Sequence, residues 1–161
     1  MADDYDSLYP IWGDIDGVDY KQTRETLASA IGKIISVVDI IPAGEDKWDE
    51  DSLFFVFTDG SQMRIYDAGQ RCCERRMMHT DDNLANFRGS TFLCVENSMY
   101  GATEIESEYI DYSFLTIRTN WGIFTLANYD AHNGYYAGFI LRAENTADNA
   151  AHGRMHSGGD R

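Results

Sequence analysis

The chain has 161 residues, enough for one domain with a sizeable core, and 43% of them are hydrophobic. With 13% aromatic residues and only two prolines, the composition excludes a disordered chain and favours β-strands. The formal net charge of −14 argues against direct binding to nucleic acid, because such a protein must neutralise phosphates.

The acidic residues are concentrated near the start of the chain. Residues 1–60 hold 14 acidic and 4 basic residues, whereas residues 61–89 hold five arginines and four acidic residues. An acidic surface either keeps a protein soluble or offers carboxylates in place of phosphates to a nucleic-acid-binding protein. Three cysteines, an acidic first segment and no apolar run long enough for a bilayer predict a cytoplasmic protein with no membrane partner.

The first third of the chain predicts an arm, a helix and a strand. Residues 1–18 mix acidic and apolar side chains, so we expect an irregular arm. Asp19 is a candidate N-cap for a helix over residues 20–31, and Gly32 ends it because glycine readily adopts the left-handed conformation. Residues 34–41 are nearly all apolar and predict a strand covered on both faces.

Two hairpins are expected. Residues 53–57 and 62–66 flank an Asp-Gly pair that favours a type I′ turn, within Thr58-Asp59-Gly60-Ser61. Residues 112–117 and 123–127 flank the second turn, Thr119-Asn120-Trp121-Gly122.

The remaining segments are assigned from caps, spacing and composition. Thr80 and Gly89 mark the start and end of a second helix. We expect polar loops over residues 45–51 and 99–108, extended chain over residues 72–79, a last strand over residues 135–143 and a loose tail from residue 145.

Short motifs recur along the chain. The segment from Leu27 to Gly32 resembles the one from Leu84 to Gly89, 57 positions later, and each precedes an apolar run. Tyr-Asp-Ala precedes a doubled residue twice, as Tyr66-Asp67-Ala68 before Cys72-Cys73 and as Tyr129-Asp130-Ala131 before Tyr135-Tyr136. The spacing predicts an internally duplicated α+β fold. Each unit has one helix and four strands, together forming a mostly antiparallel twisted sheet or barrel-like body with two short helices.

This interpretation divides the chain into four parts. They are the arm (1–18), repeat unit 1 (19–79), repeat unit 2 (80–144), which forms one globular domain with unit 1, and a flexible tail (145–161).

The two loops after the Tyr-Asp-Ala motifs are the candidate site. If the repeats are related by a twofold axis, Cys72 or Cys73 approaches His132, and a neighbouring Asp67 or Asp130 can orient the imidazole. A cysteine beside a histidine is the minimum for a nucleophilic thiolate. The simpler alternative is that the cysteines are small core residues.

A metal site is not expected, and neither is a cofactor. Cys72, Cys73, His79 and His132 lack the spacing of zinc motifs. Adjacent cysteines on a strand point to opposite faces, so they do not readily bind one ion.

Capture of a small anionic ligand is a further hypothesis. Arginine forks bind planar anions and tyrosines stack on rings. The candidate residues are Asp67, Arg71, Arg75, Arg76, Asn133, Tyr135 and Tyr136. The alternative is that these arginines pair with the protein's own carboxylates.

Several of these motifs in combination resemble a family of small phage and prophage proteins described only as a domain of unknown function. The resemblance covers residues 27–143 and rests on Thr58-Asp59-Gly60-Ser61, Gln70-Arg71-Cys72-Cys73-Glu74, Thr80-Asp81-Asp82 and His132-Asn133-Gly134-Tyr135-Tyr136. It implies a viral accessory protein in a bacterial cytoplasm and assigns no catalytic residue.

We therefore expect a small acidic, non-enzymatic binding protein that engages a host protein, such as a nucleic-acid-binding one. Two alternatives remain: an enzyme that uses Cys72 or Cys73 with His132, and a pocket that sequesters a small anionic signal molecule.

Overall fold

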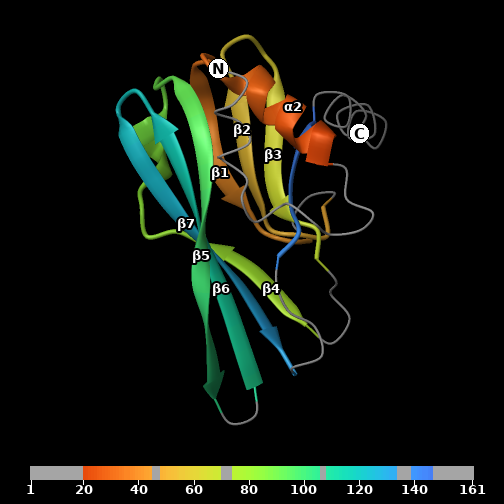
Figure 1. Cartoon of the computed structure of the whole chain (residues 1–161). Coiled ribbons are helices and arrows are strands. Elements are labelled where there is room, and N and C mark those ends of the chain that lie inside the picture. The colour runs from red at the N-terminus through yellow and green to blue at the C-terminus, as the bar shows by residue number, and fades with distance from the viewer. Residues whose placement is uncertain (1–19, 45–47, 70–73, 106–107, 134–138, 147–161) are drawn as a thin grey trace, which may run out of the picture.

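The structure, a computed structural model, describes residues 20–44, 48–69, 74–105, 108–133 and 139–146 (Figure 1). These residues form one α-helix and two four-stranded antiparallel sheets. The first sheet has the order β1 (Ile35–Ile41), β2 (Ser52–Phe57), β3 (Gln62–Asp67), β8 (Leu141–Asn145). The second has the order β4 (Arg75–His79), β7 (Gly122–His132), β6 (Glu108–Thr119), β5 (Phe92–Ile105).

Helix α2 (Tyr20–Ala30) confirms the first predicted helix. It buries Thr23, Leu27 and Ala30, which share one face at helical spacing. The Thr23 hydroxyl accepts a hydrogen bond from the Ala143 amide of β8 at 3.3 Å, which ties the helix to the first sheet. Gly32 follows with φ +86°, as predicted for the residue that ends a helix. The predicted cap, Asp19, lies outside the described residues.

Both predicted hairpins are confirmed. Strands β2 and β3 meet through residues 58–60, where the Gly60 amide donates to the Phe57 carbonyl at 2.9 Å and Gly60 has φ +86°. This is a three-residue loop instead of the predicted type I′ turn. Strands β6 and β7 pair as far as Thr119 and Gly122, so Asn120 and Trp121 form the second loop.

The predicted duplicated α+β fold with two helices is wrong, because the described residues are mostly strand with one α-helix. The second predicted helix is a single 3-10 turn, η1 (Leu84–Phe87), capped by Asn83 instead of Thr80. Thr80 and Asp82 bind the backbone of β7 instead: the Thr80 hydroxyl donates to the Thr125 carbonyl, and Asp82 accepts from the Thr125 amide. These bonds hold the segment against β7, so it cannot coil into a helix.

The strand pairing also contradicts two separate helix-plus-four-strand units. Strand β4 follows the first three strands but pairs with β7, and β8 returns from the end of the chain to pair with β3. The partners are remote in sequence, as with Met63 and Asn145. The first sheet therefore takes its fourth strand, β8, from the second predicted unit, and the second sheet takes β4 from the first predicted unit.

Three strand and loop predictions need correction. Strand β1 is an edge strand with Ser36 and Asp39 exposed, so it is not covered on both faces. Residues 99–105 are strand and not a polar loop, because β5 remains paired with β6 from Phe92 to Ile105; residues 106 and 107 lie outside the described residues. The last strand begins at Leu141, because residues 139 and 140 are not in a strand, and residues 135–138 of that prediction lie outside the described residues. Strand β4 confirms the predicted extended chain over residues 75–79, whereas residues 72 and 73 lie outside the described part.

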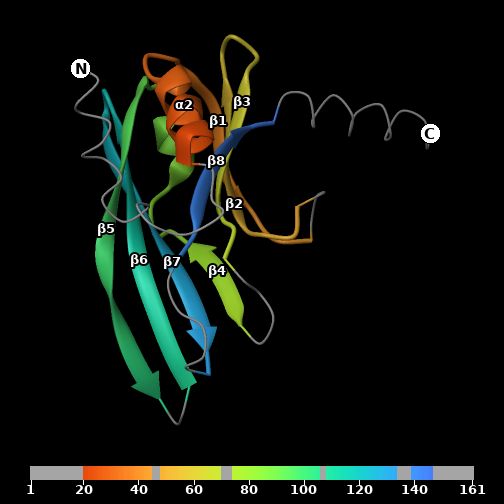
Figure 2. The ribbon, with the colours of Figure 1, turned by 45° about the vertical axis from the view of Figure 1, so that its right-hand side comes forward.

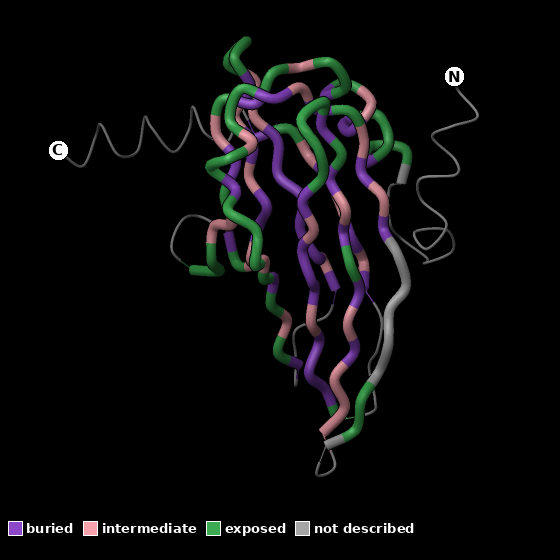
Figure 3. The backbone as a smooth tube through the Cα atoms, turned by 90° about the vertical axis from the view of Figure 1, so that its left-hand side faces the viewer, coloured by how far each residue is buried: buried purple, intermediate pink, exposed green. Residues whose placement is uncertain are grey.

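The sheets share an apolar core that lies beneath α2 and η1. Phe55 and Phe57 of the first sheet meet Phe92 of β5 edge to face, with ring centroids 5.6 and 6.1 Å apart. The long strands β5, β6 and β7 continue past the end of the first sheet (Figure 2). Buried residues alternate with more exposed ones along β6, whereas most of the second half of β7 is buried (Figure 3). Their extension is where the candidate site lies.

Candidate functional site

The inner face of the second sheet changes from apolar to polar along its length. On β7 the inward residues Phe124 and Leu126 are followed by Asn128, Asp130 and His132, all buried. On β6 the residues paired with this polar part are Ser113 and Asp111, also buried. Because alternate strand residues share a face, the polar side chains point to the same side as the core.

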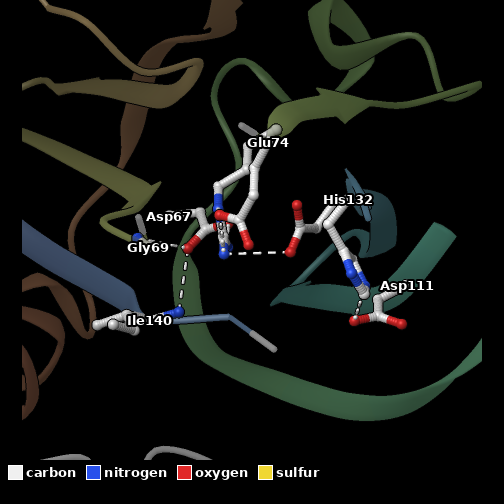
Figure 4. A network of polar contacts seen from close by, with 8 residues as sticks. Asp67, Gly69, Glu74, Asp111, His132 and Ile140 are labelled. Atoms are coloured by element: carbon white, nitrogen blue, oxygen red, sulfur yellow. Dashed lines mark hydrogen bonds and ion pairs between the residues drawn. The ribbon is translucent and has the colours of Figure 1, made fainter. Parts of the chain in front are cut away.

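Arg76 of β4 contacts three carboxylates of this region. Figure 4 shows two of them, Asp67 and Glu74, near the pair Asp111 and His132. The Arg76 guanidinium is 2.7 Å from Asp67, 2.8 Å from Glu74 and 3.1 Å from Asp130. Burial alone would lower the pKa of Arg76, but the adjacent carboxylates, Asp67 first, outweigh it and raise the pKa. The arginine therefore stays charged and joins β3, β4 and β7.

Asp67 fixes the backbone around the arginine. Its Oδ1 accepts hydrogen bonds from the Gly69 amide at 2.9 Å and from the Ile140 amide at 3.0 Å, while Oδ2 accepts from Arg76. One carboxylate thus connects the end of β3, the segment after it and the start of β8.

Asp130 is fully buried and poorly satisfied. It lies directly opposite Asp111 across β7 and β6. Neither of its oxygens accepts a hydrogen bond from a described residue, although Oδ2 forms an ion pair with Arg76. Burial raises the pKa of Asp130 to about 6, against the opposing charge of Arg76 and with a further contribution from Glu74.

His132 is paired with Asp111 and not with a cysteine in the described residues. Its Nε2 lies 3.0 Å from Asp111 Oδ2, and the imidazole stacks on Tyr109 with ring centroids 5.7 Å apart. Asp111, Asp130 and His132 each present one ligand atom, and these three atoms lie within 4.8 Å of one another. The group mixes oxygen and nitrogen donors, as metal sites often do.

The region carries more negative than positive charge. We call it the polar cluster; its members are Asp67, Glu74, Arg76, Asp111, Asn128, Asp130 and His132. Four of these side chains are carboxylates, and Arg76 is the one guanidinium that forms ion pairs with them among the described residues. Such a buried site is suited to a cation and not to an anionic ligand.

The outer face of the same sheet is apolar and aromatic. Met77, Tyr129 and Tyr112 are direct neighbours across β4, β7 and β6. Phe114 packs edge-on against Tyr112 with ring centroids 5.9 Å apart, and Ile110 lies on the other side. We call these five residues the aromatic face. Within it, Met77 and Phe114 expose 48% and 38% of their surface.

Charged and polar residues surround the aromatic face. Arg75 forms an ion pair with Glu108 at one end of the sheet, and Arg118 lies 2.8 Å from Glu96 near the other. A hollow beside Phe114 and Tyr129 is bordered by His79, Thr80, Asp81 and Asp82. An apolar centre with a polar border is the usual composition of a protein-binding surface.

The structure brings together only some of the predicted site residues. Asp67 and His132 both belong to the polar cluster, but the carboxylate beside His132 is Asp111 instead of the predicted Asp67 or Asp130. Arg75 and Arg76 point to opposite faces: Arg75 is exposed and Arg76 is surrounded by carboxylates, as the alternative interpretation expected. Asn133 is exposed at the end of β7.

The other predicted residues lie outside the described part of the chain. These are Arg71, Cys72, Cys73, Tyr135 and Tyr136. The cysteine–histidine pair and the anion pocket therefore stay predictions. Cys94 is the cysteine that the structure describes; burial raises the pKa of its thiol, which makes it less reactive.

Asp111, Asn128 and Ser113 were not predicted as site residues. A usable signal was present: Asp111 and Ser113 share the parity of the inward residues Leu115 and Ile117, and Asn128, Asp130 and His132 share that of Phe124 and Leu126. Polar residues in phase with a buried face predict a polar site within the core.

A family model described as Domain of unknown function (DUF7448) matches residues 28–141. The chain belongs to this family. The DUF7448 match includes every member of the polar cluster and of the aromatic face. It confirms the predicted resemblance to an uncharacterised family, whereas the phage origin stays a prediction. Comparisons with curated proteins and with solved structures give no match.

Among the described residues, no helix is long and apolar enough to cross a membrane.

Proposed function

We propose that the protein is a non-enzymatic binding protein that docks a partner protein on the aromatic face. The observation that carries this proposal is the row of Met77, Tyr129 and Tyr112 in direct register across three strands, flanked by the exposed Phe114. Aromatic side chains are enriched at protein interfaces because they bury a large area with few rotatable bonds, and methionine because its flexible thioether adapts to the surface of the partner.

The charge of the chain indicates the kind of partner. With a net charge of −14, the protein attracts basic surfaces and repels acidic ones. The partner therefore presents an apolar centre surrounded by lysine and arginine. A nucleic-acid-binding protein has such a basic surface, and the resemblance to small phage proteins suggests that it belongs to the host.

The test is retention of a partner by wild-type and variant proteins. Immobilised wild type is expected to retain a protein from bacterial lysate that is released by high salt, because rim charges contribute to binding. The double variant Met77→Ser, Phe114→Ser should lose this protein. The control Trp121→Ser removes an even more exposed side chain, 59% exposed, in the β6–β7 loop outside the aromatic face and should retain it.

Equal retention by the double variant would show that the partner binds elsewhere. Light scattering of the purified protein tests whether the partner is a second copy of this chain. If the wild type is a dimer and the double variant is a monomer, the aromatic face binds another copy of the chain. Circular dichroism confirms that both variants fold.

A further inference from the structure

The polar cluster has an unbalanced charge that the described residues do not neutralise. Asp67 and Glu74 share Arg76 and accept its hydrogen bonds. Asp130 forms an ion pair with Arg76 but accepts no hydrogen bond from it. Asp111 lies directly opposite Asp130 on the neighbouring strand. Two buried carboxylates opposite each other are destabilising unless a cation lies between them.

We propose that Asp111, Asp130 and His132 bind one divalent transition-metal ion, with Zn²⁺ the best fit. Asp111 Oδ2 and His132 Nε2 are 3.0 Å apart. Around a zinc ion with bonds of about 2.0–2.2 Å, tetrahedral ligand atoms are separated by roughly 3.4 Å. All three donor atoms already lie within 4.8 Å of one another, so small side-chain rotations complete the site.

Two neighbouring side chains support the proposal independently of the acidic residues. Asn128 exposes only 1% of its surface, and neither its amide oxygen nor its amide nitrogen has a hydrogen-bond partner among the described residues. The hydroxyl of Ser113, directly opposite on β6, has none either. Both residues occupy the next inward positions beside Asp130 and Asp111. Buried groups of this kind normally have a partner, and the coordination shell of a bound ion, with its water molecules, provides one.

The donor types favour zinc over the alkaline-earth ions. Ca²⁺ takes six to eight oxygen ligands, and Mg²⁺ prefers oxygen and retains several water molecules. A site with one imidazole and two carboxylates in a buried space fits a small ion with few ligands. On binding, Nε2 gives up the proton that it donates to Asp111, either to solvent from the imidazolium or by a shift to the Nδ1–H tautomer, so that its lone pair binds the metal. Asp111 changes from hydrogen-bond acceptor of His132 to ligand.

The experiment uses the full chain without an affinity tag. Protein stripped by a chelator is titrated with Zn²⁺ by calorimetry, and bound metal is measured by elemental analysis. We expect one Zn²⁺ per chain and a higher melting temperature in its presence. Substitution by Co²⁺ should give the visible absorption of a site with four ligands, which loose surface binding does not produce.

Matched variants locate the ion. Asp130→Asn and His132→Gln should each weaken Zn²⁺ binding by at least about tenfold. The exposed pair His79 and Asp81, which makes a similar contact of 2.9 Å on the surface, is the control: His79→Gln and Asp81→Asn should bind zinc as the wild type does. A His152→Gln, His156→Gln variant should also keep binding, which excludes the two other histidines of the chain.

The proposal fails if the stripped wild type takes up neither Zn²⁺ nor Mn²⁺, or if His79→Gln removes binding while His132→Gln retains it. Equal binding by all variants would mean adventitious surface binding only. If His132→Gln does not fold, Asp130→Asn decides, because an amide of the same shape preserves packing. Failure of the zinc site leaves the partner-binding test unaffected, since the aromatic face lies on the opposite side of the sheet.

Discussion

Asp111 and Asp130 lie directly opposite each other on β6 and β7, with both side chains inside the protein. Cross-strand carboxylates repel when both are charged. The arrangement determines how the metal-free protein responds to pH, to loss of Arg76 and to changes in the surrounding backbone.

The first prediction concerns Asp130→Asn in metal-free protein. Burial raises the pKa of Asp130 from 3.8 to about 6, so the folded state holds a proton that the unfolded chain has released. The stability that comes from this more tightly bound proton is fully present below pH 3.8 and is lost as the pH rises through 6. Above pH 7 we expect the variant to be more stable than wild type by on the order of 1–3 kcal/mol.

Urea unfolding between pH 4 and pH 8 in the presence of a chelator measures this difference. The comparison measures the charge of Asp130 together with its coupling to the titratable or charged groups that face it, which are present in both proteins. These groups are Asp67, Glu74, Arg76, Asp111 and His132. A difference between the two proteins that does not change with pH would contradict the prediction.

The second prediction concerns Arg76→Met. The substitution removes the guanidinium that contacts Asp67, Glu74 and Asp130 and leaves buried carboxylates without their partner. We expect a loss of about 3–5 kcal/mol in the free energy of unfolding. The control Arg75→Met removes the neighbouring exposed arginine and its surface ion pair and should cost less than about 1 kcal/mol. Similar losses for both variants, measured by urea unfolding, would show that the buried contacts contribute little.

A methyl group at position 69 tests the packing around the same guanidinium. A Cβ on Gly69 would collide with the Arg76 guanidinium, so Gly69→Ala must displace it from Asp67. We expect a loss of about 1–3 kcal/mol. In the Arg76→Met background the same change should cost clearly less, and this coupling is the decisive measurement. An equal loss in the free energy of unfolding in the two backgrounds would show that the new methyl group collides with residues other than Arg76.

A fourth prediction concerns the β2–β3 hairpin at low pH. Hydrogen bonds from Ser61, followed by the nearby Lys33, lower the pKa of Asp59 from 3.8 to about 2. The stability that this provides is present above pH 3.8 and is lost as the pH falls towards 2. Asp59→Asn keeps a hydrogen-bond acceptor but cannot ionise, so its thermal stability should fall less steeply than that of wild type between pH 4 and pH 2. Parallel curves for the two proteins would contradict this.

Local chemistry was enough to predict part of the fold. Gly32, Gly60 and Gly122 each mark a helix end or a hairpin, and all three have positive φ. Such positions depend on a few neighbouring residues. The second of the repeated Leu-Ala segments was wrongly predicted to be an α-helix. An N-cap residue and a later glycine flank a single 3-10 turn just as they flank a helix, so the sequence alone does not separate the two. Only the contact of Thr80 and Asp82 with β7 decides which forms.

The contacts within the polar cluster were beyond prediction for a different reason, although the phase of its residues on β6 and β7 indicates a polar inner face. Arg76 meets Asp67 and Asp130 because β3, β4 and β7 converge, and the sequence carries no direct sign of which strands pair. Asp67 and His132 were selected as polar residues in loops between apolar runs, yet both lie at the ends of strands. Their partners depend on strand order, which is set by the packing of the whole core.

The return of β8 to β3 has a consequence for synthesis of the chain on the ribosome. The outer edge of β3, with its unpaired amides and carbonyls, remains open until residues 141–145 have left the exit tunnel. The second sheet gains β4 only when β7 appears, more than forty residues after β4 itself. Both sheets therefore close late and nearly together, so nascent chains have a long interval in which exposed strand edges can pair with one another or be held by a chaperone.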